Sequence, residues 1–176
     1  SKPKIKILIA GQYNLYTFTA FNEVFPELCN YKEIANDYSI TFLGKGWEFA
    51  VKKLQEAGYE TNQISFVDVY LDEIIKYDIQ LTPISVGTGT KGKVLDALAN
   101  GLLVIGTPYA MENIAVENNK SCVIYRNTTQ LMSVLKEIPH QRSRYEAIAI
   151  EGRKYVLTEH NREKISKELF RLFSRV

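Results

Sequence analysis

The sequence has few of the residues that build disulfide frameworks and metal centres. Its 176 residues include two cysteines and two histidines, and Cys29 and Cys122 belong to no Cys-x-x-Cys pair. We therefore expect two free thiols, no bound metal and no metal cofactor. No apolar run reaches the roughly 18 residues of a membrane span, and the first residues do not resemble a leader peptide. These absences predict a cytoplasmic protein, either free or at the inner face of the membrane.

The net charge of the whole chain is small, but basic and acidic residues are unevenly distributed along the sequence. Lys and Arg number 22 against 20 Asp and Glu, a net charge of +2. Residues 140–176 hold nine basic and five acidic residues, whereas the remainder holds thirteen and fifteen. A nucleic-acid-binding domain is usually more basic, with its basic residues gathered on one face. We therefore expect no nucleic-acid partner and interpret the basic end as a solvated or protein-facing helical surface.

The apolar pattern alternates between strand-like and helix-like stretches along the whole chain. Near-continuous apolar strands that alternate with helices indicate a parallel sheet covered on both faces. We predict one α/β domain over residues 1–176, a Rossmann-like doubly wound sheet of about six strands with C-terminal helices. The predicted strands are 5–10, 39–43, 63–66, 78–83, 102–106 and 122–125, and the helices are 16–30, 47–57, 71–77, 90–100, 128–137 and 142–173.

The segment PISVGTGTKGKVLDALANGLLVIGTP, residues 83–108, is the most informative part of the sequence. It predicts a strand end, a glycine-rich loop, a helix and another strand. Gly87 and Gly89 allow the backbone to approach a ligand closely, and Thr90 is a candidate N-cap. Because the free N–H groups and the dipole of a helix start both favour negative charge, this loop predicts an anion site.

Lys93 lies in the first turn of that helix, where a cation opposes the dipole unless an anion is present. Asp96 follows three residues later on the same side, while Val94 and Ala97 are expected to face the sheet. A lysine for a diphosphate and a carboxylate for ribose hydroxyls would grip a nucleotide. An ordinary surface pair of Lys93 and Asp96 explains the spacing equally well.

Gly87, Gly92 and Lys93 also fit the phosphate-binding pattern G-x-x-x-x-G-K of P-loop proteins. The Ser or Thr that should follow to hold magnesium is replaced by Val94, and the loop follows the fourth predicted strand instead of the first. A P-loop nucleotide-binding protein therefore remains an alternative, as does a non-catalytic Rossmann-like interaction module.

The same segment resembles the C-terminal, donor-binding domain of GT-B retaining glycosyltransferases of the group 1 type. One branch of that family carries P-x-x-x-G-x-G-T, then Arg or Lys, then x-K-x-x-E-A-x-A-x-G-x-P-V. Val or Ile, then x-T, follow directly, with a Glu a few residues on. The residues in step are Pro83, Gly87, Gly89, Thr90, Lys91, Lys93, Ala97, Ala99, Gly101, Val104, Ile105, Thr107 and Glu112. The resemblance covers most of residues 4–137.

The resemblance implies a hexosyltransferase type of enzyme that uses a nucleotide-diphosphate sugar, in keeping with polysaccharide biosynthesis. Lys93 would be the catalytic residue, stabilising the departing diphosphate. The other implied donor-binding residues are Gly87, Thr88, Gly89, Thr90, Lys91, Asp96, Val67 near the base, and Glu112 near the sugar or phosphates.

The resemblance also implies a partner domain. The acceptor would bind to an N-terminal domain absent from this chain, which would also supply any general base. We therefore expect an inactive half on its own and allow for a lipid-linked acceptor or peripheral membrane contact.

The sequence departs from the family pattern at several site positions. Asp96 is shorter than the usual glutamate, and Thr88 replaces the first glutamate of a frequent pair. The Arg and Lys that many members place after the first strand are absent, since that loop reads Gln12, Tyr13 and Asn14. Asn113 stands where a glycine is common.

Overall fold

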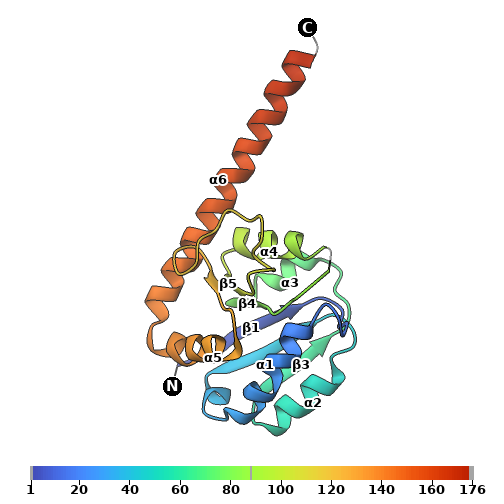
Figure 1. Cartoon of the computed structure of the whole chain (residues 1–176), viewed down its shortest axis with the longest axis vertical. Helices are drawn as coiled ribbons and strands as arrows, with labels where there is room; N and C mark the ends of the chain where they lie inside the picture. The colour runs from blue at the N-terminus through green and yellow to red at the C-terminus, as the bar shows by residue number, and fades with distance from the viewer. Residues whose placement is uncertain (1, 88, 175–176) are drawn as a thin grey trace.

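Six parallel strands form one sheet in the order β3-β2-β1-β4-β5-β6 (Figure 1). The structure, a computed structural model, describes residues 2–87 and 89–174, and only the backbone from 160 onward. The strands are β1 (Ile5–Ala10), β2 (Tyr38–Leu43), β3 (Glu60–Ile64), β4 (Ile79–Thr82), β5 (Leu103–Gly106) and β6 (Val123–Ile124). The order reverses between β1 and β4, so a crevice is expected beyond their carboxyl ends.

Helices cover both faces of the sheet, as the alternating pattern predicts. On one face α1 (Thr19–Asn30) contacts α2 (Glu48–Glu56) and α5 (Thr128–Glu137). The other face carries α3 (Tyr70–Ile74), α4 (Thr90–Ala99) and the start of α6 (Arg142–Ser174), which packs on α4 and β5. Short 3-10 turns occupy Ile34–Asn36 and Ile138–His140. Figure 1 shows α6 running on past the body of the molecule.

The core divides along β1 according to which face each side chain meets. Ile5, Ile7 and Ile9 join the main cluster, whereas Leu8 packs with Ile74 of α3 in a second one. This alternation follows from the two-residue period of a strand. Trp47 is fully buried in the main cluster, and its indole N–H donates to the carbonyl of Gly11 over 2.8 Å. That bond holds the turn that follows β1.

Two elements start three residues away from the predicted position. β3 begins at Glu60 instead of residue 63, because it is an edge strand whose first residues are polar and carry no apolar signal. α1 begins at Thr19 instead of residue 16, because the Asn14 side chain accepts hydrogen bonds from the N–H groups of Tyr16 and Thr17. Such Asx turns offer the backbone an alternative to helix. No helix in the described residues has the length and apolarity that crossing a bilayer requires.

Candidate functional site

The loop between β4 and α4 lies at the carboxyl edge of the sheet and leads directly into the first turn of α4. Gly87 and Gly89 adopt φ values of 122° and 81°, which side-chain-bearing residues rarely adopt. Gly89 is the N-cap, so the expectation that Thr90 caps α4 is wrong, and Thr90 is instead the first helical residue. Among the described residues no side chain caps this end, and the first N–H groups of α4 are therefore candidates to bind an anion. Thr88 lies outside the described residues.

Loops from three strands meet at this point. The N–H of Ser85, after β4, donates to the carbonyl of Thr17, before α1, over 2.9 Å. The hydroxyl of Tyr109, after β5, donates to the carbonyl of Gly87 over 2.8 Å. A Cβ added to Gly87 would lie 3.2 Å from the Thr17 hydroxyl oxygen. The glycine loop is therefore held from both sides, at the switch point where ligands of such sheets bind.

α4 turns an apolar stripe to the sheet and a polar stripe away from it. Val94, Ala97 and Leu98 are buried, as predicted, while Lys93 and Asp96 are half-buried. Lys93 and Asp96 form no ion pair in the described residues, although three other i,i+3 pairs do form: Glu73–Lys76, Glu117–Lys120 and Glu151–Lys154. In those pairs the acid precedes the base, which is the orientation that suits the helix dipole. The interpretation as a surface pair is therefore not supported.

Lys93 and Lys91 supply the cationic charge next to the loop. Neither forms an ion pair in the part of the chain that the structure describes, and Lys91 is exposed. The turn after β1 adds no cation. Its Tyr13 hydroxyl donates to the Asn22 side chain over 3.0 Å, and Asn14 holds the turn before α1. Lys91 and Lys93, together with the start of α4, are therefore the positive groups closest in sequence to the glycine loop.

Tyr70 is a neighbour of Asp96 that the sequence did not indicate. Burial, and then the negative charge of Asp96, raise the pKa of Tyr70 to about 12. Its hydroxyl oxygen is buried and has no hydrogen-bond partner among the described residues. Tyr70 also packs on the small apolar cluster that includes Val67. The loop after β3 and the polar stripe of α4 are thus neighbours across this side chain.

The remaining two candidates, Val67 and Glu112, lie in the loops after β3 and β5. Val67 is half-buried and lines a hollow of about 350 Å³ after β3, next to Phe66, which is 77% exposed. No residue of α4 lines that hollow. Glu112 is exposed, and Asn113 beside it adopts φ 62°, which explains why a glycine suits that position.

The P-loop alternative does not fit the geometry. Gly92 lies within α4 and has no positive φ. Val94, which stands where magnesium would need a hydroxyl, is fully buried. No group of three or more His, Cys, Asp or Glu side chains able to hold a metal comes together in the described residues.

Comparisons with known proteins agree with this architecture. No family model matches the sequence, and no curated protein matches it either. The C-terminal domain of a group 1 glycosyl transferase, LpcC from Francisella tularensis, is 18% identical with a TM-score of 0.73, over 89% of this chain and 86% of that domain. HepE from Anabaena, in complex with UDP-glucose, is 11% identical with a TM-score of 0.73, over 98% of this chain and 49% of HepE.

A third structure, of an S. aureus TarM mutant in complex with UDP and other ligands, is 12% identical with a TM-score of 0.75. The match covers 97% of this chain and 35% of TarM. This chain therefore spans about half of HepE and about a third of TarM. At these identities the comparisons establish the fold alone, which this chain shares with the C-terminal domain of LpcC, a group 1 glycosyl transferase.

Proposed function

We propose that this chain binds the nucleotide-diphosphate-sugar donor of a glycosyltransferase. The observation that carries the proposal is the position of Lys93, which lies in the first turn of α4, directly after the Gly87–Gly89 loop at the switch point. Lys93 forms no ion pair in the described residues. A cation there is disfavoured by the helix dipole, and a bound diphosphate would remove that conflict. The HepE structure, of the same fold, contains UDP-glucose, which supports this class of ligand.

In the proposed reaction the donor's sugar moves to an acceptor hydroxyl while negative charge builds on the departing diphosphate. Fixed donors aimed at that charge would lower the barrier. Lys93 and the first N–H groups of α4 would meet the phosphates, with Lys91 and the Gly87–Thr90 backbone around them. Asp96 would accept hydrogen bonds from the ribose hydroxyls. Val67 would lie near the base, and Glu112 near the sugar or the phosphates.

The acceptor would be bound by a second domain. Because this chain matches about half of HepE, we propose that it binds donor but does not turn over alone. Any general base would belong to the other half, and the acceptor would be a growing polysaccharide or a lipid-linked sugar. With two lysines and a helix start facing the diphosphate, no metal ion is required for charge balance.

The proposal is tested by titrating the 176-residue chain with UDP-sugars, GDP-sugars and ATP with magnesium. Backbone NMR should show that one of the diphosphate sugars shifts the amides of Gly87, Gly89 and Lys93, and that EDTA does not change its affinity. Calorimetry gives the dissociation constant. A lack of response to every nucleotide sugar would overturn the proposal and leave the interaction module as the better interpretation.

A further inference from the structure

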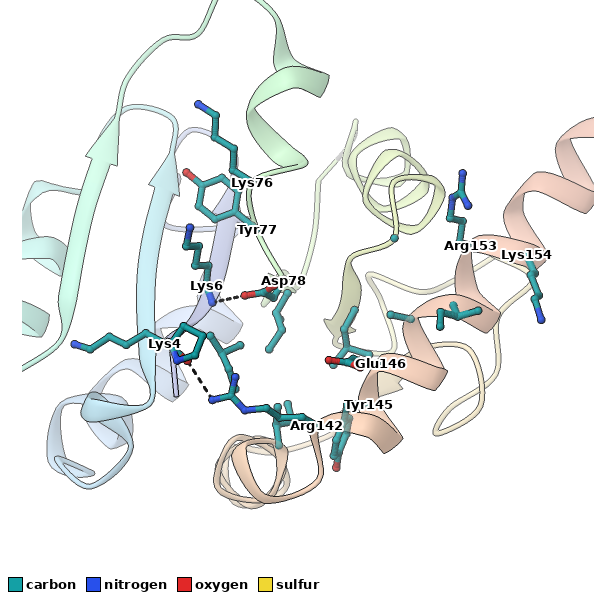
Figure 2. Close-up of a pocket in the computed structure, with 18 of the residues that line it drawn as sticks. Lys4, Lys6, Lys76, Tyr77, Asp78, Arg142, Tyr145, Glu146, Arg153 and Lys154 are labelled. Carbon is teal, nitrogen blue, oxygen red and sulfur yellow. Dashed lines mark hydrogen bonds between the residues drawn. The ribbon is translucent and has the colours of Figure 1, made fainter. Parts of the chain in front are cut away.

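A groove lies at the amino edge of the sheet, opposite the glycine loop. It is a cavity of about 730 Å³ between the starts of β1, β4 and β5 and the first half of α6. Figure 2 shows Lys6 and Asp78 on its sheet wall and Arg142 and Arg153 on its helix wall. None of the residues of the proposed donor site lines it, so a ligand of this groove would not occupy the proposed donor site.

Positive charge predominates around the groove. Six basic side chains line it against two acidic ones, Asp78 and Glu146. Lys6, Arg142 and Arg153 form no ion pair in the described residues. The other three, Lys4, Lys76 and Lys154, pair with Glu60, Glu73 and Glu151. The pairs of Lys4 and Lys154 are exposed and contribute little, so these two lysines remain available to a competing carboxylate. Lys76 is instead held 2.7 Å from the buried Glu73.

The guanidinium groups are only partly occupied. Arg142 donates from Nη2 to the carbonyl of Pro3 over 3.2 Å, and its buried Nε has no acceptor in the described residues. Arg153 donates from Nε to the carbonyl of Ala99, at the end of α4, over 3.1 Å. Because each guanidinium has five N–H donors, most of its capacity is left for an incoming acceptor.

Apolar side chains separate the two charged walls. Ile79, Leu103 and Ala149 are buried at the floor of the groove. On α6, Ile150 is 55% exposed and Leu157 is 39% exposed, although both line the groove. They are seven residues apart, about two helical turns, and so share one side of α6. An apolar floor between basic walls suits a ligand with an apolar face and acidic flanks.

The spacing of the cations identifies the shape of that ligand. Arg142 and Arg153 are eleven residues apart, which is about three turns or about 16 Å along the same side of α6. A single phosphate group could not meet both, whereas carboxylates spread along a helix could. Strand addition is also ruled out, because an amino edge presents the ends of strands and not their unpaired sides. Helix-in-groove recognition uses an apolar stripe of this kind.

We propose that this groove is a docking site for an acidic amphipathic helix of a partner protein. The partner's apolar stripe would lie on Ile150, Leu157 and the floor, parallel or antiparallel to α6. Its carboxylates would reach Arg153 and Arg142 on one flank and Lys6 on the other. Complementary charge of this sort favours association and register more than raw affinity.

The test uses a designed peptide of about 18 residues, or five turns, with leucines along one face and glutamates on both flanks. Fluorescence anisotropy with the 176-residue chain should give saturable binding that weakens as salt is raised. A peptide with the same leucines but lysines for glutamates should bind at least about tenfold more weakly. Backbone NMR should place the acidic peptide at Lys6, Asp78 and Ile150.

Two variants of the chain and one control complete the test. Arg153→Glu and Ile150→Ser should each lower the affinity for the acidic peptide about tenfold. If thermal melting shows that Arg153→Glu disturbs the fold, Lys6→Glu is used in its place. Lys52→Glu, on the exposed side of α2, makes the same charge change and should leave binding within about twofold.

Equal binding of the acidic and basic peptides, or an equal loss with Lys52→Glu, would overturn the proposal. So would shifts confined to the Gly87 loop. If vesicles with anionic phospholipid bind the chain in an Arg153-dependent way and the peptide does not, the groove is a lipid site and the proposal is wrong.

Discussion

Replacing Lys93 with alanine should stabilise the free chain and weaken donor binding. Lys93 lies in the first turn of α4 and forms no ion pair in the described residues, so removing its charge should gain about 0.3–1 kcal/mol of folding free energy. A hydrogen bond to a charged group contributes about 1.5–3 kcal/mol. Because Lys93 is half-buried, the lower part of that range applies, or an affinity loss of about tenfold or somewhat more.

The gain in stability and the loss of donor affinity can both be measured on one preparation of the Lys93→Ala variant. Urea denaturation gives the free energy of unfolding, and calorimetry with the best-binding nucleotide sugar gives the affinity. Lys52→Ala is the matched control, because Lys52 is an exposed helical lysine on α2, away from the loop. It should change neither quantity appreciably.

A loss of stability in the Lys93 variant, together with unchanged affinity, would refute the reasoning. That pair of results would mean that the ammonium serves the fold and not a ligand. A loss of both would show that the variant disturbs the loop, and Lys93→Gln would then separate charge from packing.

Gly89→Ala should cost about 1–2 kcal/mol, because its φ of 81° is left-handed although a Cβ would meet open space, and it should weaken donor binding. Gly92→Ala should gain about 0.5–1 kcal/mol in urea denaturation with donor affinity kept, since it is helical and equally open. Tyr70→Phe should leave stability unchanged or raise it by up to about 1 kcal/mol, because the lost hydroxyl is buried without a partner in the described residues; a clear loss would show a bond that forms in solution. Burial raises the pKa of Tyr70 and Tyr145 to about 12, so stability should be complete below pH about 10 and fall as pH rises toward 12, with tyrosinate absorbance appearing late in a spectrophotometric titration.

Most of the fold could be predicted from apolar periodicity and glycine positions. The strands at 5–10 and 102–106 are buried on both faces, so their signal is strong and their positions agree with the structure to within one residue. β3 is an edge strand in which one of five residues is buried, so its apolar signal is weak and its prediction was displaced. Periodicity cannot detect a strand that lacks a buried face.

The candidate site also has a part that the sequence could predict and a part that it could not. The Gly87 loop, Lys93 and Asp96 are close in sequence, so their spacing on one loop and helix could be interpreted directly. Tyr109 reaches Gly87 from the loop after β5, and Tyr70 approaches Asp96 from α3. These two contacts arise from the strand order and from the directions of the side chains, and neither can be predicted from a local sequence pattern.

α4 connects the two edges of the sheet. Its first turn carries Lys93, and at its other end the carbonyl of Ala99 accepts a hydrogen bond from Arg153. An occupant of the groove that drew Arg153 toward itself would break the hydrogen bond to Ala99 and remove a positive charge from the C-terminus of α4. α4 is a helix of ten residues, and its N-terminus would face the diphosphate. Donor and docking partner would then alter each other's affinity by one common factor, and each would report the presence of the other across the thickness of the domain.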